Sequence, residues 1–133
     1  MNNELNNSPQ FQHIRVLREG LIAWVTLNRP NKANALSHDH LAEIEAAALA
    51  FRDDAETRVV IFNGNGRHFS SGADLTEPKQ EPPLPLVQTR RRARMGERAI
   101  EAILGIDQIT IAAWHGAAMG GGACLTTACD FRV

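Results

Sequence analysis

The sequence predicts an α/β fold whose strands are joined through crossover helices. Short apolar runs alternate with helix-favouring segments in the order β, β, α, β, α, β, α. Turn-forming residues separate these segments. The 133 residues are 44% hydrophobic and 22% charged, which is an ordinary composition for a domain with one buried core.

Two extended segments, His13–Arg18 and Leu21–Leu27, begin the pattern and are predicted to form a hairpin. Glu19 and Gly20 between them are typical of a tight turn. Alternate side chains of the second segment divide between two faces, as they do along a strand. Residues 1–10 are polar, and we expect them to form a disordered tail ahead of a domain spanning 11–133.

A helix is predicted next, from the capping residue Ser37 to near Asp54. Its apolar residues recur at spacings of three and four: Leu41, Ile44, Ala48 and Phe51. The run Arg58–Phe62 is rich in β-branched residues and too short for a helix. We therefore expect it to be a strand buried on both faces.

An irregular segment, Gly64–Pro85, holds four of the six prolines. We expect it to lie on the surface, to be partly mobile and to contribute to a site. Leu86–Leu104 is predicted to be one long helix with arginines in its middle. A strand over Ile109–Trp114, a glycine-rich turn, a short helix ending at Cys129 and an extended run over Asp130–Val133 complete the pattern.

The charge and the amino-terminal sequence exclude several classes of partner. A net charge of −1 gives no long-range attraction to nucleic acid or to an anionic membrane. The arginines between Arg90 and Arg98 lack the interleaved aromatic residues typical of a nucleic-acid site. No run approaches the roughly 20 apolar residues that cross a bilayer, and the first twelve residues resemble neither a secretory nor a transit sequence. We expect a cytoplasmic protein without nucleic-acid or membrane partners.

Two glycine-bearing loops, each after a predicted strand, form the candidate site. In HFSSGADL, His68–Leu75, glycine lets the backbone turn and present the amides of Ala73 and its neighbours. In HGAAMGGGA, His115–Ala123, three glycines leave N–H donors open where a helix begins, or else only permit close helix packing. Two donors from two loops could hold one oxyanion. Loss of one such donor typically costs about 3 to 4 kcal/mol of transition-state stabilisation.

Nucleotide and metal sites are disfavoured. The second loop lacks both the G-x-G-x-x-G spacing and the Lys-Ser/Thr ending of phosphate-binding loops. Cys124 and Cys129 are five residues apart, about 140° around a helix, which suits neither a metal pair nor a disulfide. We expect two free thiols and no metal.

Four segments, in order, resemble the enoyl-CoA hydratase/isomerase, or crotonase, superfamily. They are LNRP at 27–30, NAL at 34–36, RVVIFNGNGRHFSSGADL at 58–75 and AWHGAAMGGGACLTTACDFRV at 113–133. The last two are specific in combination, and the resemblance covers most of residues 11–133. It implies a crotonase-like spiral core of ββα turns, assembly as homotrimers or hexamers, and an acyl-CoA substrate with no further cofactor.

The resemblance also implies roles for individual residues. The amides of Ala73 and Gly121 would form an oxyanion hole, and Lys32 and Ala33 would approach the adenine end of coenzyme A. The acyl-CoA site would be lined by Ala73, Asp74, Leu75, Thr76 and Gly121. From its sequence context, we expect the Asp74 carboxylate to brace its own loop rather than to transfer protons. The histidines flanking the loops, His68 and His115, are expected to be structural.

Two features depart from the family pattern. Cys124 stands where hydratases of the family carry a glutamate, and a thiol with a pKa near 8.5 cannot replace a carboxylate with a pKa near 4 in adding water. Cys124 could be a nucleophile, a base or a neutral pocket wall. Family members are about twice as long, so the domain is expected to be truncated here, with the general base beyond residue 133.

Two functional readings follow from the resemblance and its departures. One is an enzyme that stabilises a thioester enolate, as an isomerase, lyase, decarboxylase or hydrolase, of which these 133 residues alone would be inactive. The alternative is a catalytically inactive subunit for coenzyme A binding or assembly. The arginines at 90–98 could contact the phosphates of coenzyme A, or form a solvated helix face paired with Glu97 and Glu101.

Overall fold

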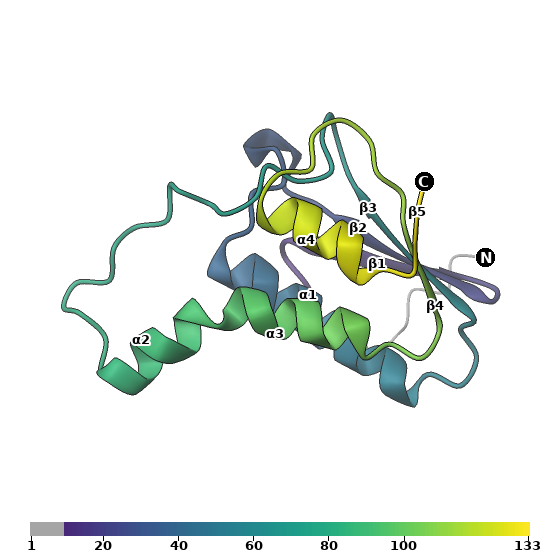
Figure 1. The fold of residues 1–133 in the computed structure, drawn as a ribbon, viewed down its shortest axis with the longest axis horizontal. Coiled ribbons are helices and arrows are strands. Elements are labelled where there is room, and N and C mark those ends of the chain that lie inside the picture. The colour runs from purple at the N-terminus through teal and green to yellow at the C-terminus, as the bar shows by residue number, and fades with distance from the viewer. Residues whose placement is uncertain (1–9) are drawn as a thin grey trace.

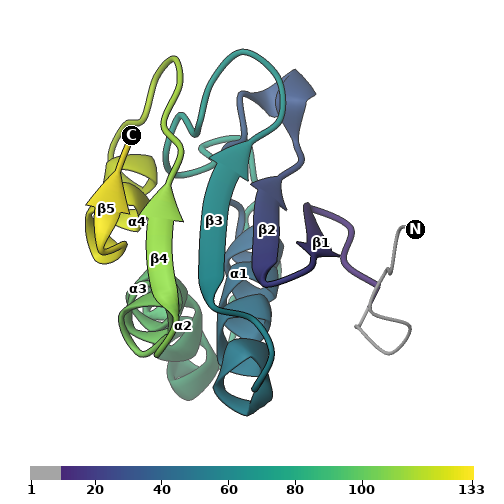
Figure 2. The ribbon, with the colours of Figure 1, turned by 90° about the vertical axis from the view of Figure 1, so that its right-hand side faces the viewer.

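A computed structural model describes residues 10–133, so the predicted disordered tail lies outside the described residues except for residue 10. Five strands form one sheet in the order β1-β2-β3-β4-β5 (Figure 2). The strands are β1 (Ile14–Glu19), β2 (Ile22–Leu27), β3 (Val59–Gly64), β4 (Ile109–Ala112) and β5 (Phe131–Arg132). β1 and β2 pair antiparallel, and all other pairs are parallel. The predicted α/β fold with an opening hairpin is confirmed.

Four α-helices connect these strands: α1 (His38–Ala50), α2 (Leu86–Ala93), α3 (Met95–Leu104) and α4 (Gly121–Ala128). Short 3-10 turns occupy Pro30–Lys32 and Phe51–Asp53. Ser37 caps α1 as predicted, because its hydroxyl accepts the His40 N–H at 3.1 Å. All four α-helices lie on one side of the sheet (Figures 1 and 2). None of the helices in residues 10–133 is long and apolar enough to cross a membrane.

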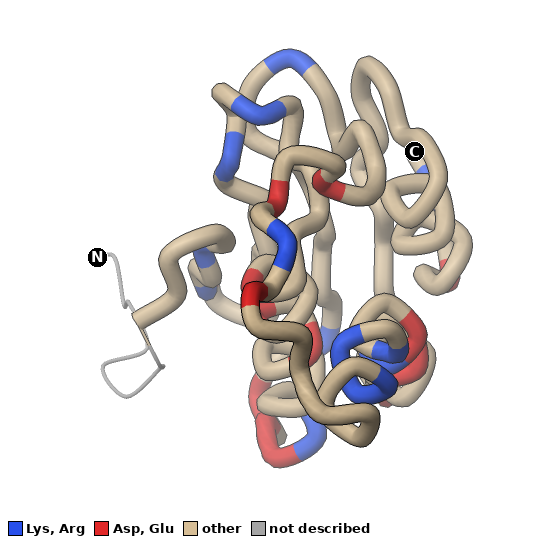
Figure 3. Tube along the Cα trace, turned by 90° about the vertical axis from the view of Figure 1, so that its left-hand side faces the viewer, with Lys and Arg blue, Asp and Glu red and all other residues tan. Residues whose placement is uncertain are grey.

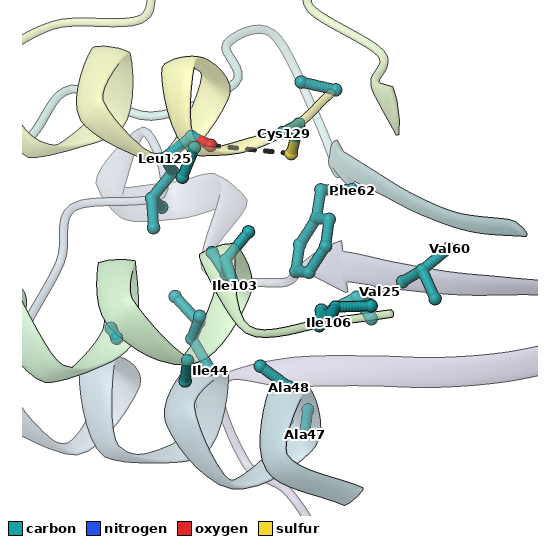
Figure 4. Packing of buried hydrophobic residues seen from close by; sticks show 14 of the residues in the cluster. Val25, Ile44, Ala47, Ala48, Val60, Phe62, Ile103, Ile106, Leu125 and Cys129 are labelled. Atoms are coloured by element: carbon teal, nitrogen blue, oxygen red, sulfur yellow. Dashed lines mark hydrogen bonds between the residues drawn. The ribbon is translucent and has the colours of Figure 1, made fainter. Parts of the chain in front are cut away.

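The core fills the space between the sheet and these helices (Figure 4). Each layer contributes small or branched side chains, so that α1 and α3 approach each other closely beneath the strands. The fully buried members include Val25 and Val60 from the strands, Ile44 and Ala48 from α1, and Ile103 from α3. The predicted apolar stripe of α1 thus packs inward at Ile44 and Ala48.

The prediction that Arg58–Phe62 is buried on both faces is wrong for residues 10–133. Val60 and Phe62 face the helices and are 0% and 2% exposed, whereas Val59 and Ile61 on the other face are only half-buried. The register aligns Ile61 with Trp24 on β2 and Ile111 on β4, so the outer face carries an apolar row. The difference arises because all four helices lie on the inner face.

Two further expectations need correction. Leu86–Leu104 is two helices rather than one, because the backbone of Arg94 departs from helical geometry, with φ −95° and ψ 4°. α3 buries Ala99, Ala102 and Ile103, whereas α2 buries no residue, so only α3 is held by the core. The strand predicted to reach Trp114 ends at Ala112, and Trp114 is 45% exposed.

Candidate active site

Three loops meet at one edge of the sheet. They follow β2, β3 and β4, which are mutually parallel, so their carboxyl ends lie together (Figure 2). In α/β sheets this edge is where ligands commonly bind. The two glycine-bearing loops of the predicted site are the second and third of these.

The first two loops are joined by a short ladder at Leu36 and Ala73. The Leu36 N–H donates to the Gly72 carbonyl at 2.7 Å, and the Asp74 N–H donates to the Leu36 carbonyl at 3.1 Å. The Ser71 N–H donates to the Ala33 carbonyl at 2.9 Å. Ala73 is therefore held by backbone bonds on both sides.

The second and third loops also run side by side, through a bridge between Ser70 and Ala118. The Met119 N–H donates to the Ser70 carbonyl at 3.0 Å. Gly72 has a φ of 90°, and a Cβ atom added there would lie 2.7 Å from the Met119 carbonyl oxygen. Glycine is needed at position 72 for both its conformation and this close approach. Ser70 is fully buried, so this part of the segment predicted to lie on the surface is instead an anchor.

The amides of Ala73 and Gly121 are both available as donors. Within residues 10–133 neither amide donates a hydrogen bond. Gly121 is the first residue of α4, where backbone N–H groups have no helical acceptor and the helix dipole is positive. Leu36, which pairs with Ala73, has its Cδ1 3.1 Å from the Cβ position of Gly121. The two residues thus share Leu36 as a neighbour.

Asn34 organises the site, although the sequence analysis gave it no role. Its buried side-chain amide donates to the carbonyls of Asn65 and His68, both at 2.9 Å, and its Oδ1 accepts the Arg29 N–H at 2.8 Å. Asn34 has a φ of 52°, a region that asparagine adopts more readily than most residues. Its place in the NAL motif, just before the helix cap, was the available signal.

Asp74 braces its loop as predicted. Its Oδ1 accepts the Thr76 N–H at 2.9 Å and the Thr76 hydroxyl at 2.6 Å, and its Oδ2 lies 2.9 Å from the Arg29 guanidinium. The bonds from Thr76, followed by the interaction with Arg29, lower the pKa of Asp74 to about 2. The carboxylate is therefore ionised near neutral pH and is turned away from solvent, with 4% exposure. Any contact of Asp74 with a ligand would use its backbone.

The remaining predicted ligand contacts lie on the same edge. Lys32 and Ala33 end the 3-10 turn after β2, and Ala33 contacts Ser71 through its carbonyl. Leu75 is 93% exposed and Thr76 is exposed. Cys124 is exposed on α4, three residues after Gly121.

Both flanking histidines make structural contacts. His68 Nδ1 accepts the Ala117 N–H at 3.1 Å, and His115 Nε2 lies 2.8 Å from the Gly66 carbonyl oxygen. These contacts agree with the expectation that both histidines are structural, which stays a prediction. Across the described chain, no three His, Cys, Asp or Glu side chains are grouped to hold a metal ion.

Comparison with known proteins shows which family has this sequence and fold. The enoyl-CoA hydratase/isomerase family model matches residues 18–133. The crotonyl-CoA hydratase of Syntrophomonas wolfei is 33% identical over 124 residues, covering 92% of this chain and 46% of that protein. The peroxisomal Delta(3,5)-Delta(2,4)-dienoyl-CoA isomerase of Arabidopsis thaliana is 34% identical over 128 residues, covering 90% and 46%. The chain spans about half the length of these relatives.

A solved structure of an enoyl-CoA hydratase has a similar fold. The crystal structure of enoyl-CoA hydratase from Bacillus anthracis superposes with a TM-score of 0.79 at 36% identity, covering 91% of this chain and 46% of that one. The fold and its paired loops define an α/β protein of the crotonase type. The chain belongs to the enoyl-CoA hydratase/isomerase family. The resemblance read from the four motifs is confirmed.

Proposed function

We propose that this chain is the part of an enoyl-CoA hydratase/isomerase-type enzyme that binds an acyl-CoA thioester and stabilises its enolate. One observation supports this above the others: the amides of Ala73 and Gly121 are free of partners within residues 10–133, on loops that contact each other. Two amides directed at one thioester oxygen stabilise the charge that develops when a base removes a proton from the α-carbon. The names of the hydratase and isomerase relatives agree with a CoA thioester substrate.

Other residues have supporting roles in this proposal. Lys32 and Ala33 approach the adenine end of coenzyme A, and Leu75 and Thr76 line the acyl-CoA site beside Ala73. Asp74 holds the loop and is assigned no proton transfer, because Thr76 and Arg29 occupy its two carboxylate oxygens and a pKa of about 2 makes it a weak base. The general base lies outside these 133 residues. No cofactor besides the coenzyme A of the substrate is required, and a cytoplasmic homotrimer or hexamer belongs to the same proposal.

The thiol of Cys124 limits the set of reactions that the site could catalyse. It stands at the position of the family glutamate and is exposed beside the site, where a thiol cannot hold water as a carboxylate does. Ordinary hydration of an enoyl thioester is therefore disfavoured. The reaction is an isomerisation, a lyase reaction, a decarboxylation or a hydrolysis. Each of these passes through an enolate or a related thioester oxyanion.

Hydrogen exchange at carbon distinguishes this proposal from a catalytically inactive subunit. The full-length protein, including the segment proposed to carry the general base, is incubated with butanoyl-CoA in heavy water, and deuterium at the α-carbon and free coenzyme A are both measured. Exchange supports enolate formation, and release of coenzyme A supports a hydrolase. Binding with neither result favours the inactive coenzyme A-binding subunit.

Two substitutions at one position test the Gly121 donor. Gly121→Pro removes the N–H, whereas Gly121→Ala keeps it and adds a Cβ atom, 3.1 Å from Leu36 Cδ1. Loss of the donor is expected to lower the rate by about 10²- to 10³-fold in the proline variant. Affinity for butanoyl-CoA gives a second measurement if turnover is absent. Equal losses in both variants would mean that crowding against Leu36, rather than the amide, is responsible.

A further inference from the structure

Glu77 binds the start of α1 across 39 positions of sequence. Its Oε1 accepts the backbone N–H of His38 at 3.0 Å, and its Oε2 lies 2.6 Å from His38 Nδ1. A carboxylate oxygen only accepts, so Nδ1 carries the proton and donates. The two side chains are 31% and 24% exposed, for His38 and Glu77 respectively, so the pair is partly shielded from water.

The surroundings favour a negative charge at this point. His38 is the first residue of α1, where the positive end of the helix dipole and open N–H groups stabilise a carboxylate. An Arg92 nitrogen lies 3.0 Å from the same ring nitrogen of His38. Basic residues are grouped along α2, which carries Arg92 (Figure 3). Because Nδ1 directs its proton to Glu77, it cannot also accept from Arg92, so Glu77 joins the loop after β3 to α1 and not to α2.

Glu77 is the last of three fixed points on the segment Gly72–Glu77. The Leu36 ladder holds its start, the Arg29–Asp74 ion pair holds its middle, and His38 holds its end. All three partners belong to the stretch 29–38. Beyond Glu77 the attachment stops, since residues 78–83 make no hydrogen bond within the described chain. This stretch forms a wide arc that leads to α2 (Figure 1).

We infer that Glu77, held by His38, is a positioning residue that keeps the amide of Ala73 in place for an acyl-CoA thioester. The inference rests on the proposed function for its ligand. Ala73 lies only four residues before Glu77, and its ladder to Leu36 consists of two hydrogen bonds. Without the hydrogen bonds of Glu77, the restraints nearest to the 78–83 arc would be the Arg29–Asp74 pair and that ladder. The hydrogen bonds from His38 to Glu77 thus lie between the Ala73 amide and the 78–83 arc, which makes no hydrogen bond within the described chain.

Amide hydrogen exchange in the 133-residue chain tests whether the contact between Glu77 and His38 holds this segment in place. In Glu77→Gln, the side chain loses its charge and keeps one acceptor oxygen instead of two, and its NH₂ group can bond His38 Nδ1 only if the ring gives up the Nδ1 proton. The amides of Leu36 and Asp74 are then expected to exchange about tenfold faster, as for loss of a hydrogen bond to a charged group. Glu81→Gln is the control, because Glu81 lies in the same loop without a hydrogen bond or ion pair in residues 10–133. It should leave both amides unchanged.

Ligand affinity separates positioning from simple stabilisation. The dissociation constant of butanoyl-CoA is expected to rise severalfold in Glu77→Gln and to stay unchanged in Glu81→Gln. Wild-type exchange rates in Glu77→Gln would overturn the inference, as would faster exchange with unaltered affinity. If the unsubstituted chain fails to bind butanoyl-CoA, the proposed function fails, and exchange alone then decides whether Glu77 fixes the segment.

A second variant guards against effects on folding. His38→Ala removes the ring and keeps the backbone N–H that donates to Glu77 Oε1. If the pair acts as one unit, the double variant of His38→Ala and Glu77→Gln exchanges no faster than the more affected single variant. Additive increases in the exchange rates would show that the two side chains act independently, and would contradict the inference.

Discussion

The guanidinium of Arg29 and the carboxylate of Asp74 lie 2.9 Å apart and join the loop after β2 to the loop that carries Ala73. The Arg29 side chain is 16% exposed and that of Asp74 is 4% exposed. Arg29 also donates from Nη1 to the carbonyl of Ala35. The pair therefore links the start and end of the first loop with the middle of the second, and its loss should loosen both.

Arg29→Met should destabilise the fold by about 2 to 3 kcal/mol, because removing one partner leaves the shielded Asp74 charge without a guanidinium. Thr76 still bonds the carboxylate, which keeps the loss below that of a fully buried pair. The free energy of unfolding is measured by urea titration. Arg94→Gln is the matched control, since the Arg94–Glu97 pair is exposed and should have little measurable effect. Equal losses in the two variants would contradict the structural role of Arg29.

The same carboxylate predicts a loss of stability in acid. The folded pKa of Asp74, about 2, is below its usual value of 3.8, so its stabilisation is present above pH 4 and is lost as the pH falls toward 2. The shift corresponds to about 2 kcal/mol. Asp74→Asn should remove this dependence between pH 4 and pH 2, as followed by urea midpoints. An unchanged slope in that window would mean that another group is responsible.

Gly72→Ala should separate the two loops of the site. The added Cβ would lie 2.7 Å from the Met119 carbonyl oxygen, and its φ of 90° is unfavourable for alanine. Gly20→Ala is the control, because Gly20 has a φ of 61° and open space around its Cβ position. Backbone strain alone should cost about 1 to 2 kcal/mol at Gly20, and the loss at Gly72 should be clearly larger. Similar losses would show that the Met119 contact yields easily.

Local patterns predicted much of this fold. The Ser37 cap and the apolar spacing in α1 depend on neighbours in sequence, and both are found in the structure. The hairpin turn is shifted by one residue, to Gly20 and Leu21, because Glu19 pairs with Ile22 at the end of β1. The break at Arg94 could not be predicted, because helix propensity continues through it and the difference lies in which helix meets the core. The exposed outer face of β3 depends on which layers cover the sheet, and periodicity does not reveal that.

Some residues of the candidate site could likewise be predicted from the sequence, and others could not. The two loops could be found from their glycines and motifs, and Asp74 was expected to bond within its own loop. Asn34, Arg29 and Glu77 were missed because their partners lie 5 to 45 positions away and become neighbours only after folding. A polar side chain whose partners come from other loops leaves no periodic signal.

The two thiols should differ sharply in reactivity. Cys124 is exposed, whereas Cys129 is 4% exposed and its thiol donates to the Leu125 carbonyl at 3.6 Å (Figure 4). Burial raises the pKa of Cys129 to about 11, so only about a thousandth of it is thiolate at pH 8. N-ethylmaleimide should modify one thiol in the folded chain, none in Cys124→Ser, and both in urea. Rapid modification of Cys129 without denaturant would contradict its burial.

His40 predicts a second acid-sensitive step, at higher pH than that of Asp74. The ring is completely buried, its Nδ1 donates to the Ala35 carbonyl at 3.1 Å, and its Nε2 has no partner among residues 10–133. Burial lowers the pKa of His40 to about 4 from 6.5. Between these two pH values the imidazole is therefore neutral in the folded chain and protonated in the unfolded chain.

Stability should therefore fall as the pH decreases from 6.5 to 4, by about 3 kcal/mol in total, and this contribution should be constant below pH 4. His40→Gln does not titrate, and its amide can still donate to Ala35. Urea midpoints at pH 7 and pH 4.5 should differ much less in this variant than in the unsubstituted chain, whatever its stability at pH 7. If both chains lose the same free energy between these pH values, the buried imidazole is not the group that senses acid in this window.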